Sequence, residues 1–101
     1  MGQINMMQQD SPNYVVSRSY TMLTEYVRAA MDKAAYEMLS DRTFYGEIPG
    51  FQGVYANEAT LEACREELRQ VLEGWIVLGL QMGHSLPVVE GIDLTVKEAT
   101  G

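Results

Sequence analysis

The clearest pattern of apolar and polar positions lies between residues 61 and 82. Thr60 is suited to cap a helix that starts there, and Glu62 places a negative charge in its first turn. Gly83 and Pro87 mark the end of the pattern. We therefore predict an amphipathic helix of 22 residues, about 33 Å long. Its apolar stripe consists of Leu61, Cys64, Leu68, Val71, Leu72, Trp75, Leu78, Gly79 and Met82.

The second half of this predicted helix is apolar on nearly every side. Ile76, Val77 and Leu80 join the stripe that already contains Trp75. A sheet covers only one face of a helix, so the remaining apolar surface needs the other helix of the chain or a second subunit as cover. We expect homo-oligomerisation, with Trp75, Ile76, Val77 and Leu80 at the interface.

Alternating and β-branched runs predict the strands. Residues 43–48 and 54–56 are two β-prone runs, and Pro49 and Gly50 begin the short connector between them. This arrangement favours an antiparallel hairpin. Residues 92–97 alternate apolar and polar side chains and predict another strand with one buried face.

The N-terminal part gives a weaker signal. Residues 1–13 are polar without an apolar period, which indicates a flexible arm. Residues 14–22 are β-prone and fit an edge strand, an arm docked on a neighbouring subunit or a poorly ordered leader. Residues 23–31 carry an amphipathic helical stripe. Periodicity leaves residues 35–39 open, because they fit both a continuation of that helix and a strand.

Composition and charge limit the class of protein. The 101 residues fit one domain, and 14 acidic against 7 basic residues give a net charge of −7. Such a charge repels phosphate backbones and favours a basic partner. The longest apolar run, residues 75–80, is too short to span a bilayer, and no signal peptide is evident. A single cysteine excludes an intramolecular disulfide, so we expect a cytoplasmic protein without direct nucleic-acid binding.

Candidate catalytic chemistry is sparse. His84 is the one histidine and lies in a predicted loop, and Cys64 lies on the apolar stripe as a small core residue. Glu37, Glu47 and Asp93 are outward-facing strand carboxylates, a pattern more typical of a solvated sheet face than of a metal-dependent nuclease. We expect no enzymatic activity, no catalytic residue, no metal site and no cofactor.

One predicted surface has a distinctive composition. Glu37, Tyr45, Glu47 and Tyr55 are expected on the sheet face that points away from the helices. Tyrosines and carboxylates together suit recognition of a basic protein. A half-solvated antiparallel sheet without any partner would carry similar residues, so both interpretations stay open.

From Phe44 onward the chain resembles the HicB-like antitoxins of bacterial type II toxin–antitoxin modules and their short single-domain relatives. The order and spacing of several short motifs carry the resemblance. It departs from the family pattern at Gly50, where an acid is usual, at Gln52, which replaces a proline, and at Asn57-Glu58, which replaces a glycine-acid turn. The matching motifs are Tyr45-Gly46-Glu47-Ile48-Pro49-Gly50, Phe51-Gln52-Gly53-Val54-Tyr55-Ala56, Glu58-Ala59-Thr60-Leu61-Glu62-Ala63, Leu72-Glu73-Gly74-Trp75-Ile76, Gly83-His84-Ser85-Leu86-Pro87 and Ile92-Asp93-Leu94-Thr95-Val96.

The resemblance implies a small single α+β domain. Its order would be α-β-β-β-α-β, a truncated RNase H-like layout with an antiparallel-rich sheet and helices on one face. Residues 35–39 then become the first strand. The implied organisation is an N-terminal arm at 1–22, a HicB-like domain at 23–97 and a tail at 98–101, with no operator-binding domain.

The resemblance also implies a function. HicB-like antitoxins mask a small basic HicA-like mRNA interferase, so the first hypothesis is an antitoxin or antitoxin-related binding protein. The second hypothesis is an orphan, stand-alone oligomeric module with no toxin partner and no activity. The apolar half of the predicted 61–82 helix and the β-prone residues 14–20 favour the second.

Overall fold

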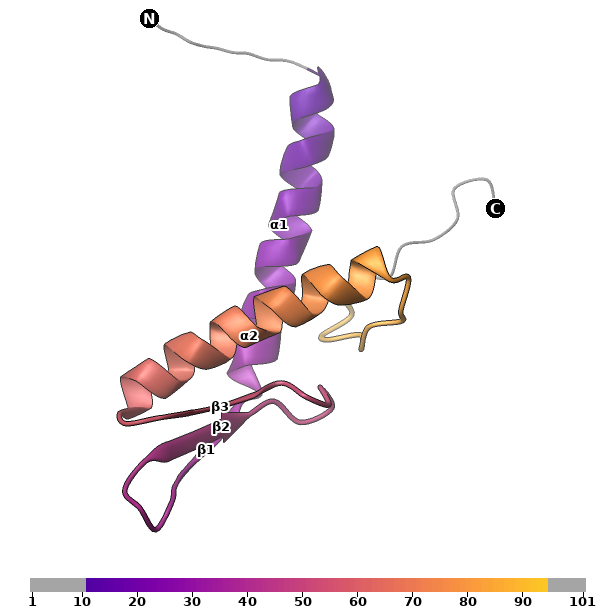
Figure 1. Cartoon of the computed structure of the whole chain (residues 1–101). Coiled ribbons are helices and arrows are strands. Elements are labelled where there is room, and N and C mark those ends of the chain that lie inside the picture. Colours follow the sequence, from indigo (N-terminus) through magenta and orange to yellow (C-terminus); the bar gives the residue numbers. More distant parts are fainter. Residues whose placement is uncertain (1–10, 95–101) are drawn as a thin grey trace, which may run out of the picture.

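The fold was described from a computed structural model, which covers the backbone of residues 11–94 and the side chains of residues 22–94. This part of the chain contains two long helices, with three short strands between them in the sequence (Figure 1). Their order, α-β-β-β-α, matches the first five elements of the predicted α-β-β-β-α-β. The bounds are α1 Ser11–Asp32, β1 Ala35–Met38, β2 Phe44–Glu47, β3 Tyr55–Glu58 and α2 Leu61–Gln81.

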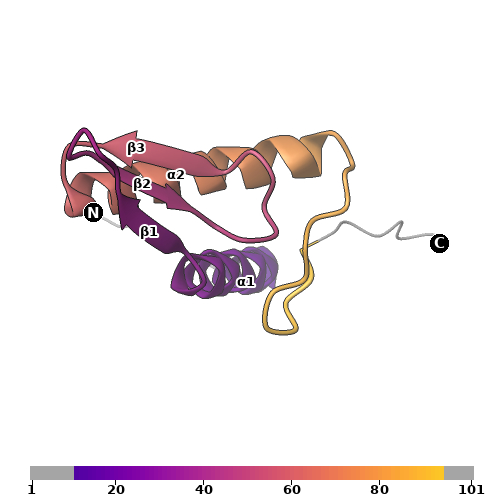
Figure 2. The ribbon, with the colours of Figure 1, turned by 90° about the horizontal axis from the view of Figure 1, so that it is seen from below.

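The strands form one antiparallel sheet in the order β1-β2-β3. Helix α2 packs along β2 and β3 on one face of the sheet, and α1 lies beside β1 (Figure 2). The opposite face carries no helix from the described part of the chain. The small α+β domain with helices on one face of an antiparallel sheet is confirmed.

The loop between β2 and β3 contains two consecutive tight turns. The Phe51 amide donates to the Ile48 carbonyl at 3.0 Å, and the Val54 amide donates to the Phe51 carbonyl at 3.1 Å. Gly50 and Gly53 occupy the third position of these turns with φ of 89° and 91°. A type II turn requires positive φ at that position, and Pro49 supplies the preferred residue before Gly50. Local turn chemistry therefore fixes the hairpin that the sequence predicted.

The core lies between the sheet and the two helices. Tyr26 and Ala30 enter it from α1, and Leu68, Leu72 and Ile76 enter it from α2. The buried hydrophobic residues within 22–94 are Tyr26, Ala29, Ala30, Met31, Ile48, Phe51, Val54, Ala56, Cys64, Leu68, Leu72, Ile76, Leu86 and Val89.

The N-terminal part differs from the prediction. Helix α1 already begins at Ser11, so residues 11–13 of the predicted flexible arm are helical, and residues 14–22 are helical and do not form an edge strand. The preference of valine and tyrosine for strands is weak and depends on context. The C-terminal half of α1 packs on the core, and adding residues to an existing helix is favourable, so the helix extends through these residues. Residues 1–10 of the predicted arm lie outside the described residues. Residues 35–38 form the first strand, as the family resemblance implies.

The C-terminal part turns back on itself after α2. The Val89 amide donates to the Ile92 carbonyl at 3.1 Å, and the Ile92 amide donates to the Val89 carbonyl at 2.8 Å. Glu90 and Gly91 form the two-residue turn with positive φ at both positions. Ile92 pairs with Val89, and residues 92–94 are not part of the sheet. The rest of the predicted strand at 92–97 and the predicted tail at 98–101 lie outside the described residues.

None of the helices within residues 11–94 has the length and apolar character needed to cross a bilayer.

Candidate partner-binding face

The strand register brings the four predicted partner-binding residues together. Glu37 on β1 is paired with Tyr45 on β2, and Glu47 on β2 is paired with Tyr55 on β3. Side chains alternate along a strand, so all four project from the same face. Gly46 and Ala56 point to the opposite, buried face. The open face of the sheet therefore carries the predicted cluster, which we call the tyrosine–glutamate face: Glu37, Tyr45, Glu47 and Tyr55.

Contacts within the tyrosine–glutamate face hold it in a defined arrangement. The rings of Tyr45 and Tyr55 stack with centroids 6.2 Å apart and an interplanar angle of 26°. They are diagonal neighbours on adjacent strands, close enough for aromatic contact. The Tyr45 hydroxyl donates to Glu47 Oε1 at 3.1 Å. The aromatic pair and one carboxylate are thus positioned before any partner arrives.

The environment also sets the protonation of Tyr45. Desolvation raises the pKa of its hydroxyl, and the Glu47 carboxylate that accepts its hydrogen bond raises the pKa further. Tyr45 therefore keeps its proton, and with it the hydrogen bond to Glu47, to a higher pH than an ordinary tyrosine does. In the described part of the chain, no lysine or arginine forms an ion pair with Glu37 or Glu47. Both carboxylates are open to an external cation.

A hollow of about 450 Å³ adjoins this face at the end of the hairpin. Tyr45, Glu47 and Tyr55 form its sheet side, and the double turn at residues 48–54 forms the other side. The sequence did not predict the hollow, because its shape depends on how the loop folds back against the strand ends. The signal in the sequence that could have indicated the hollow is the pair of turn glycines, Gly50 and Gly53.

Asn57 lies beside the face and was also missed from the sequence. Its Nδ2 donates to the Phe44 carbonyl at 2.8 Å and to Thr43 Oγ1 at 2.9 Å. Asp41 accepts from both the amide and the hydroxyl of Thr43, and these hydrogen bonds lower the pKa of the Asp41 carboxyl. The polar network ties the β1–β2 turn to β3.

The predicted interface residues on α2 do not share one exposed surface. Ile76 is only 1% exposed and belongs to the core of the single chain, so it cannot contact a second subunit. The Trp75 ring packs on Phe51 with centroids 5.2 Å apart, and Leu80 is half-buried against the core. Val77 alone is largely exposed, at 51%. The helix turns these side chains by about 100° per residue, so neighbouring apolar positions face different surroundings.

Other apolar side chains of α2 are exposed instead. Leu78 and Met82 lie one turn apart and are both more than half exposed. Gly74 lies one turn before Leu78, with open space where a Cβ would project. This apolar row consists of Gly74, Leu78 and Met82.

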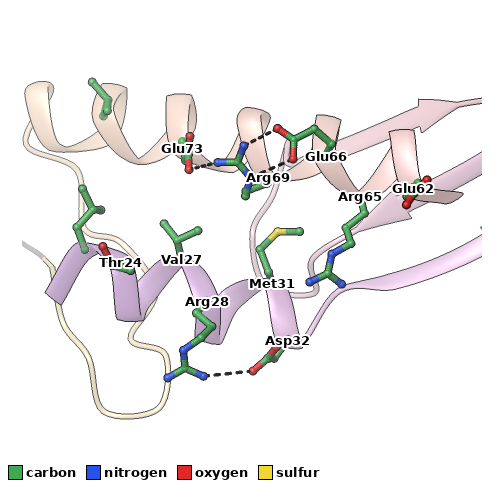
Figure 3. A pocket seen from close by; sticks show the side chains of 12 residues that line it. Thr24, Val27, Arg28, Met31, Asp32, Glu62, Arg65, Glu66, Arg69 and Glu73 are labelled. Atoms are coloured by element: carbon green, nitrogen blue, oxygen red, sulfur yellow. Dashed lines mark hydrogen bonds and ion pairs between the residues drawn. The ribbon is translucent and has the colours of Figure 1, made fainter. Parts of the chain in front are cut away.

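A second surface feature is the groove between α1 and α2, of about 850 Å³ (Figure 3). Leu23, Val27, Met31 and Val77 give it apolar lining, and charged side chains line its rims. The sequence could not predict the groove, because it depends on how the two helices cross. Its charges are mostly paired: Arg69 with Glu66 and Glu73, and Arg28 with Glu25 and Asp32.

Groups capable of catalysis or metal binding are not assembled in the part of the chain that the structure describes. No three His, Cys, Asp or Glu side chains within residues 22–94 are placed to hold a metal ion. Cys64 is buried, with its Sγ 3.6 Å from the Ala56 carbonyl oxygen, and burial raises the pKa of its thiol. His84 is exposed in the loop after α2.

The fold and the open face define a small α+β domain, built as a helix, an antiparallel three-stranded sheet and a long second helix. The chain belongs to the UPF0150-like family, which is related to the HicB-like antitoxins: the family profile matches residues 25–87. A solved structure with a similar fold is that of TTHA0281 from Thermus thermophilus. The two chains are 33% identical with a TM-score of 0.71, over 76% of this chain and 96% of TTHA0281. No curated protein matches the chain.

Proposed function

We propose that the chain is an antitoxin-type binding module that masks a small basic protein of the HicA-like mRNA interferase class. The observation that carries the proposal is the tyrosine–glutamate face, where two unpaired carboxylates flank two stacked tyrosines on an open sheet. Membership of an antitoxin-related family supports the same class of partner.

The mechanism would be occlusion. An RNA-binding toxin needs positive charge to hold phosphates, and the carboxylates of Glu37 and Glu47 would offset that charge. The outward side of the three strands carries Ala35, Glu37, Tyr45, Glu47, Tyr55 and Asn57, and therefore no cation that would repel a basic partner. The tyrosines would supply contact area that loses little side-chain entropy on binding.

Co-expression with the protein encoded by the adjacent reading frame tests this function. We expect the neighbour to arrest growth when expressed alone, and the chain to relieve that arrest and to co-purify with the neighbour at low salt. Binding should weaken as salt rises, because exposed charges are screened. A small basic neighbour that forms no complex at low salt would refute the antitoxin proposal.

Charge reversal locates the binding surface. Glu47→Lys should reduce both the relief of growth arrest and the yield of complex. The matched control is Glu62→Lys, which makes the same change of charge on the helical side of the molecule. Equal loss in both variants would mean that only net charge matters, and that the tyrosine–glutamate face has no specific role.

A second candidate function is a stand-alone oligomeric module. The exposed apolar row of Gly74, Leu78 and Met82, along α2 and its C-terminal cap, favours it, because contiguous exposed apolar surface can mark a site of protein association. Light scattering at micromolar concentration should then give a mass above one chain, and Leu78→Lys should reduce it. The control is Gln70→Lys, at another exposed position of α2. A strict monomer before any substitution would contradict this candidate.

A further inference from the structure

The hollow beside the tyrosine–glutamate face is open to solvent and large enough to admit a side chain of a partner. It is bounded by Tyr45, Glu47 and Tyr55 on the sheet and by the double turn at residues 48–54. Its volume is about 450 Å³. Gly50 and Gly53 lie on the loop side, and a Cβ added at either position would have no atom within 4 Å. Both glycines therefore face open space and do not pack against other parts of the chain.

The negative charge in this hollow favours binding of a cation. Its one charged side chain is Glu47, whose Oε1 accepts from Tyr45. No cation within the described residues is paired with Glu47. An anion would be repelled, and a metal ion would lack ligands, because no three metal-binding side chains gather in the described part of the chain.

The stacked tyrosines narrow the choice to a flat cation. The rings of Tyr45 and Tyr55 stack on each other and line the hollow, and the negative face of an aromatic ring attracts a cation. A guanidinium is planar and weakly hydrated, stacks on aromatic rings and pairs with a carboxylate through two parallel N–H donors. A lysine ammonium is strongly hydrated and has no flat surface to stack.

We propose that the hollow receives the guanidinium of an arginine side chain from the basic partner, stacked against Tyr45 and Tyr55 and paired with Glu47. This inference rests on the proposed function for the source of the arginine. The inference is more specific than a general attraction between opposite charges. It names one type of residue in the partner and one place on this chain.

Titration of the isolated ¹⁵N-labelled chain with short peptides tests the pocket. The probes are acetyl-Gly-Arg-Gly-amide, the same peptide with citrulline, and the same peptide with lysine. Citrulline has nearly the shape of arginine but no charge. We expect saturable shifts of the amide signals from residues 45–55 with the arginine peptide, and binding at least about fivefold weaker with the other two. Equal shifts with arginine and citrulline, or shifts confined to the α1–α2 groove, would overturn the proposal.

Two substitutions show whether the named side chains are responsible. Glu47→Gln keeps the shape and removes the charge, and Tyr55→Leu removes one ring from an exposed position. Each should weaken arginine-peptide binding by about fivefold or more, whereas Glu62→Gln should leave it unchanged. The dispersion of the amide spectrum verifies that each variant is folded. Unchanged binding in the folded Glu47 and Tyr55 variants would overturn the assignment.

The peptide test is separate from the test of the proposed function. If the arginine peptide binds at the hollow but no basic partner is found by co-expression, the pocket is supported and the antitoxin role fails. If the partner is masked but the arginine peptide does not bind, the antitoxin role stands and the arginine pocket is refuted.

Discussion

The Tyr26 hydroxyl donates to the Pro87 carbonyl oxygen at 2.6 Å, across 61 positions of sequence. Tyr26 is in α1, and Pro87 is in the segment that follows α2. The Tyr26 side chain is fully buried, and its ring also contacts Phe51 with centroids 6.2 Å apart. One side chain thus connects the first helix, the hairpin loop and the C-terminal segment.

Replacing Tyr26 by phenylalanine should destabilise the fold by about 1–2 kcal/mol. The substitution keeps the ring packing but leaves a part-buried carbonyl oxygen without its donor. Urea denaturation, followed by circular dichroism, measures the free energy of unfolding.

The matched control is Tyr36→Phe. The Tyr36 hydroxyl is buried and has no hydrogen-bond partner among the described residues. Its removal should leave the stability unchanged or raise it by up to about 1 kcal/mol. Equal destabilisation in the two variants would show that the Tyr26–Pro87 hydrogen bond contributes nothing specific.

Stability should fall as the pH rises from 10 to about 12. Burial, reinforced by the Asp93 carboxylate, raises the pKa of Tyr26 from 10.0 to about 12. In that window the unfolded chain releases the phenolic proton while the folded chain retains it, so the free energy of unfolding decreases with pH. The contribution, on the order of 2 kcal/mol, is complete below pH 10 and lost above about 12. Urea denaturation at pH 9, 10 and 11 should show the loss, and Tyr26→Phe should remove most of it.

Much of the fold could be predicted because its signals are local. Three of these signals each act over a few residues and are present in the structure. They are the Pro49-Gly50 turn, the alternation through Tyr45 and Glu47, and the cap at Thr60. Residues 14–22 were interpreted wrongly, because β-prone residues there are part of a helix whose other half is packed on the core. The pairing of Ile92 with Val89 depends on the Glu90-Gly91 turn, which the alternating pattern did not reveal.

The candidate site was predicted only in part. Strand alternation and pairing are enough to place Glu37, Tyr45, Glu47 and Tyr55 on one face. The hollow at residues 48–54 and the groove between α1 and α2 arise from tertiary packing, which no short pattern encodes. Tertiary packing also explains the burial of Ile76. The core of the single chain covers this side chain, which was expected to be covered by a second subunit.

Replacing Thr60 by alanine should destabilise the fold by about 1 kcal/mol. The Thr60 hydroxyl accepts a hydrogen bond from the Ala63 amide at 3.0 Å and caps the first turn of α2. Thermal unfolding measures the loss. Thr60→Ser is the control, since it retains the acceptor and should stay close to the parent chain. If the Thr60→Ser variant is as unstable as the alanine variant, the loss of stability comes from removing the methyl group and not from removing the capping hydrogen bond.

Two glycines should respond in opposite directions to alanine. At Gly46 a Cβ would lie 2.7 Å from Tyr36 Cδ1 and 3.1 Å from Cys64 Sγ, so Gly46→Ala has to displace the Tyr36 ring and crowds Cys64 of α2, which should cost about 1–3 kcal/mol. At Gly74, inside α2, a Cβ would have no atom within 4 Å. Gly74→Ala should therefore stabilise the helix by about 0.5–1 kcal/mol. Urea denaturation of both variants measures the two effects, and a destabilised Gly74→Ala chain would contradict the open surroundings of Gly74.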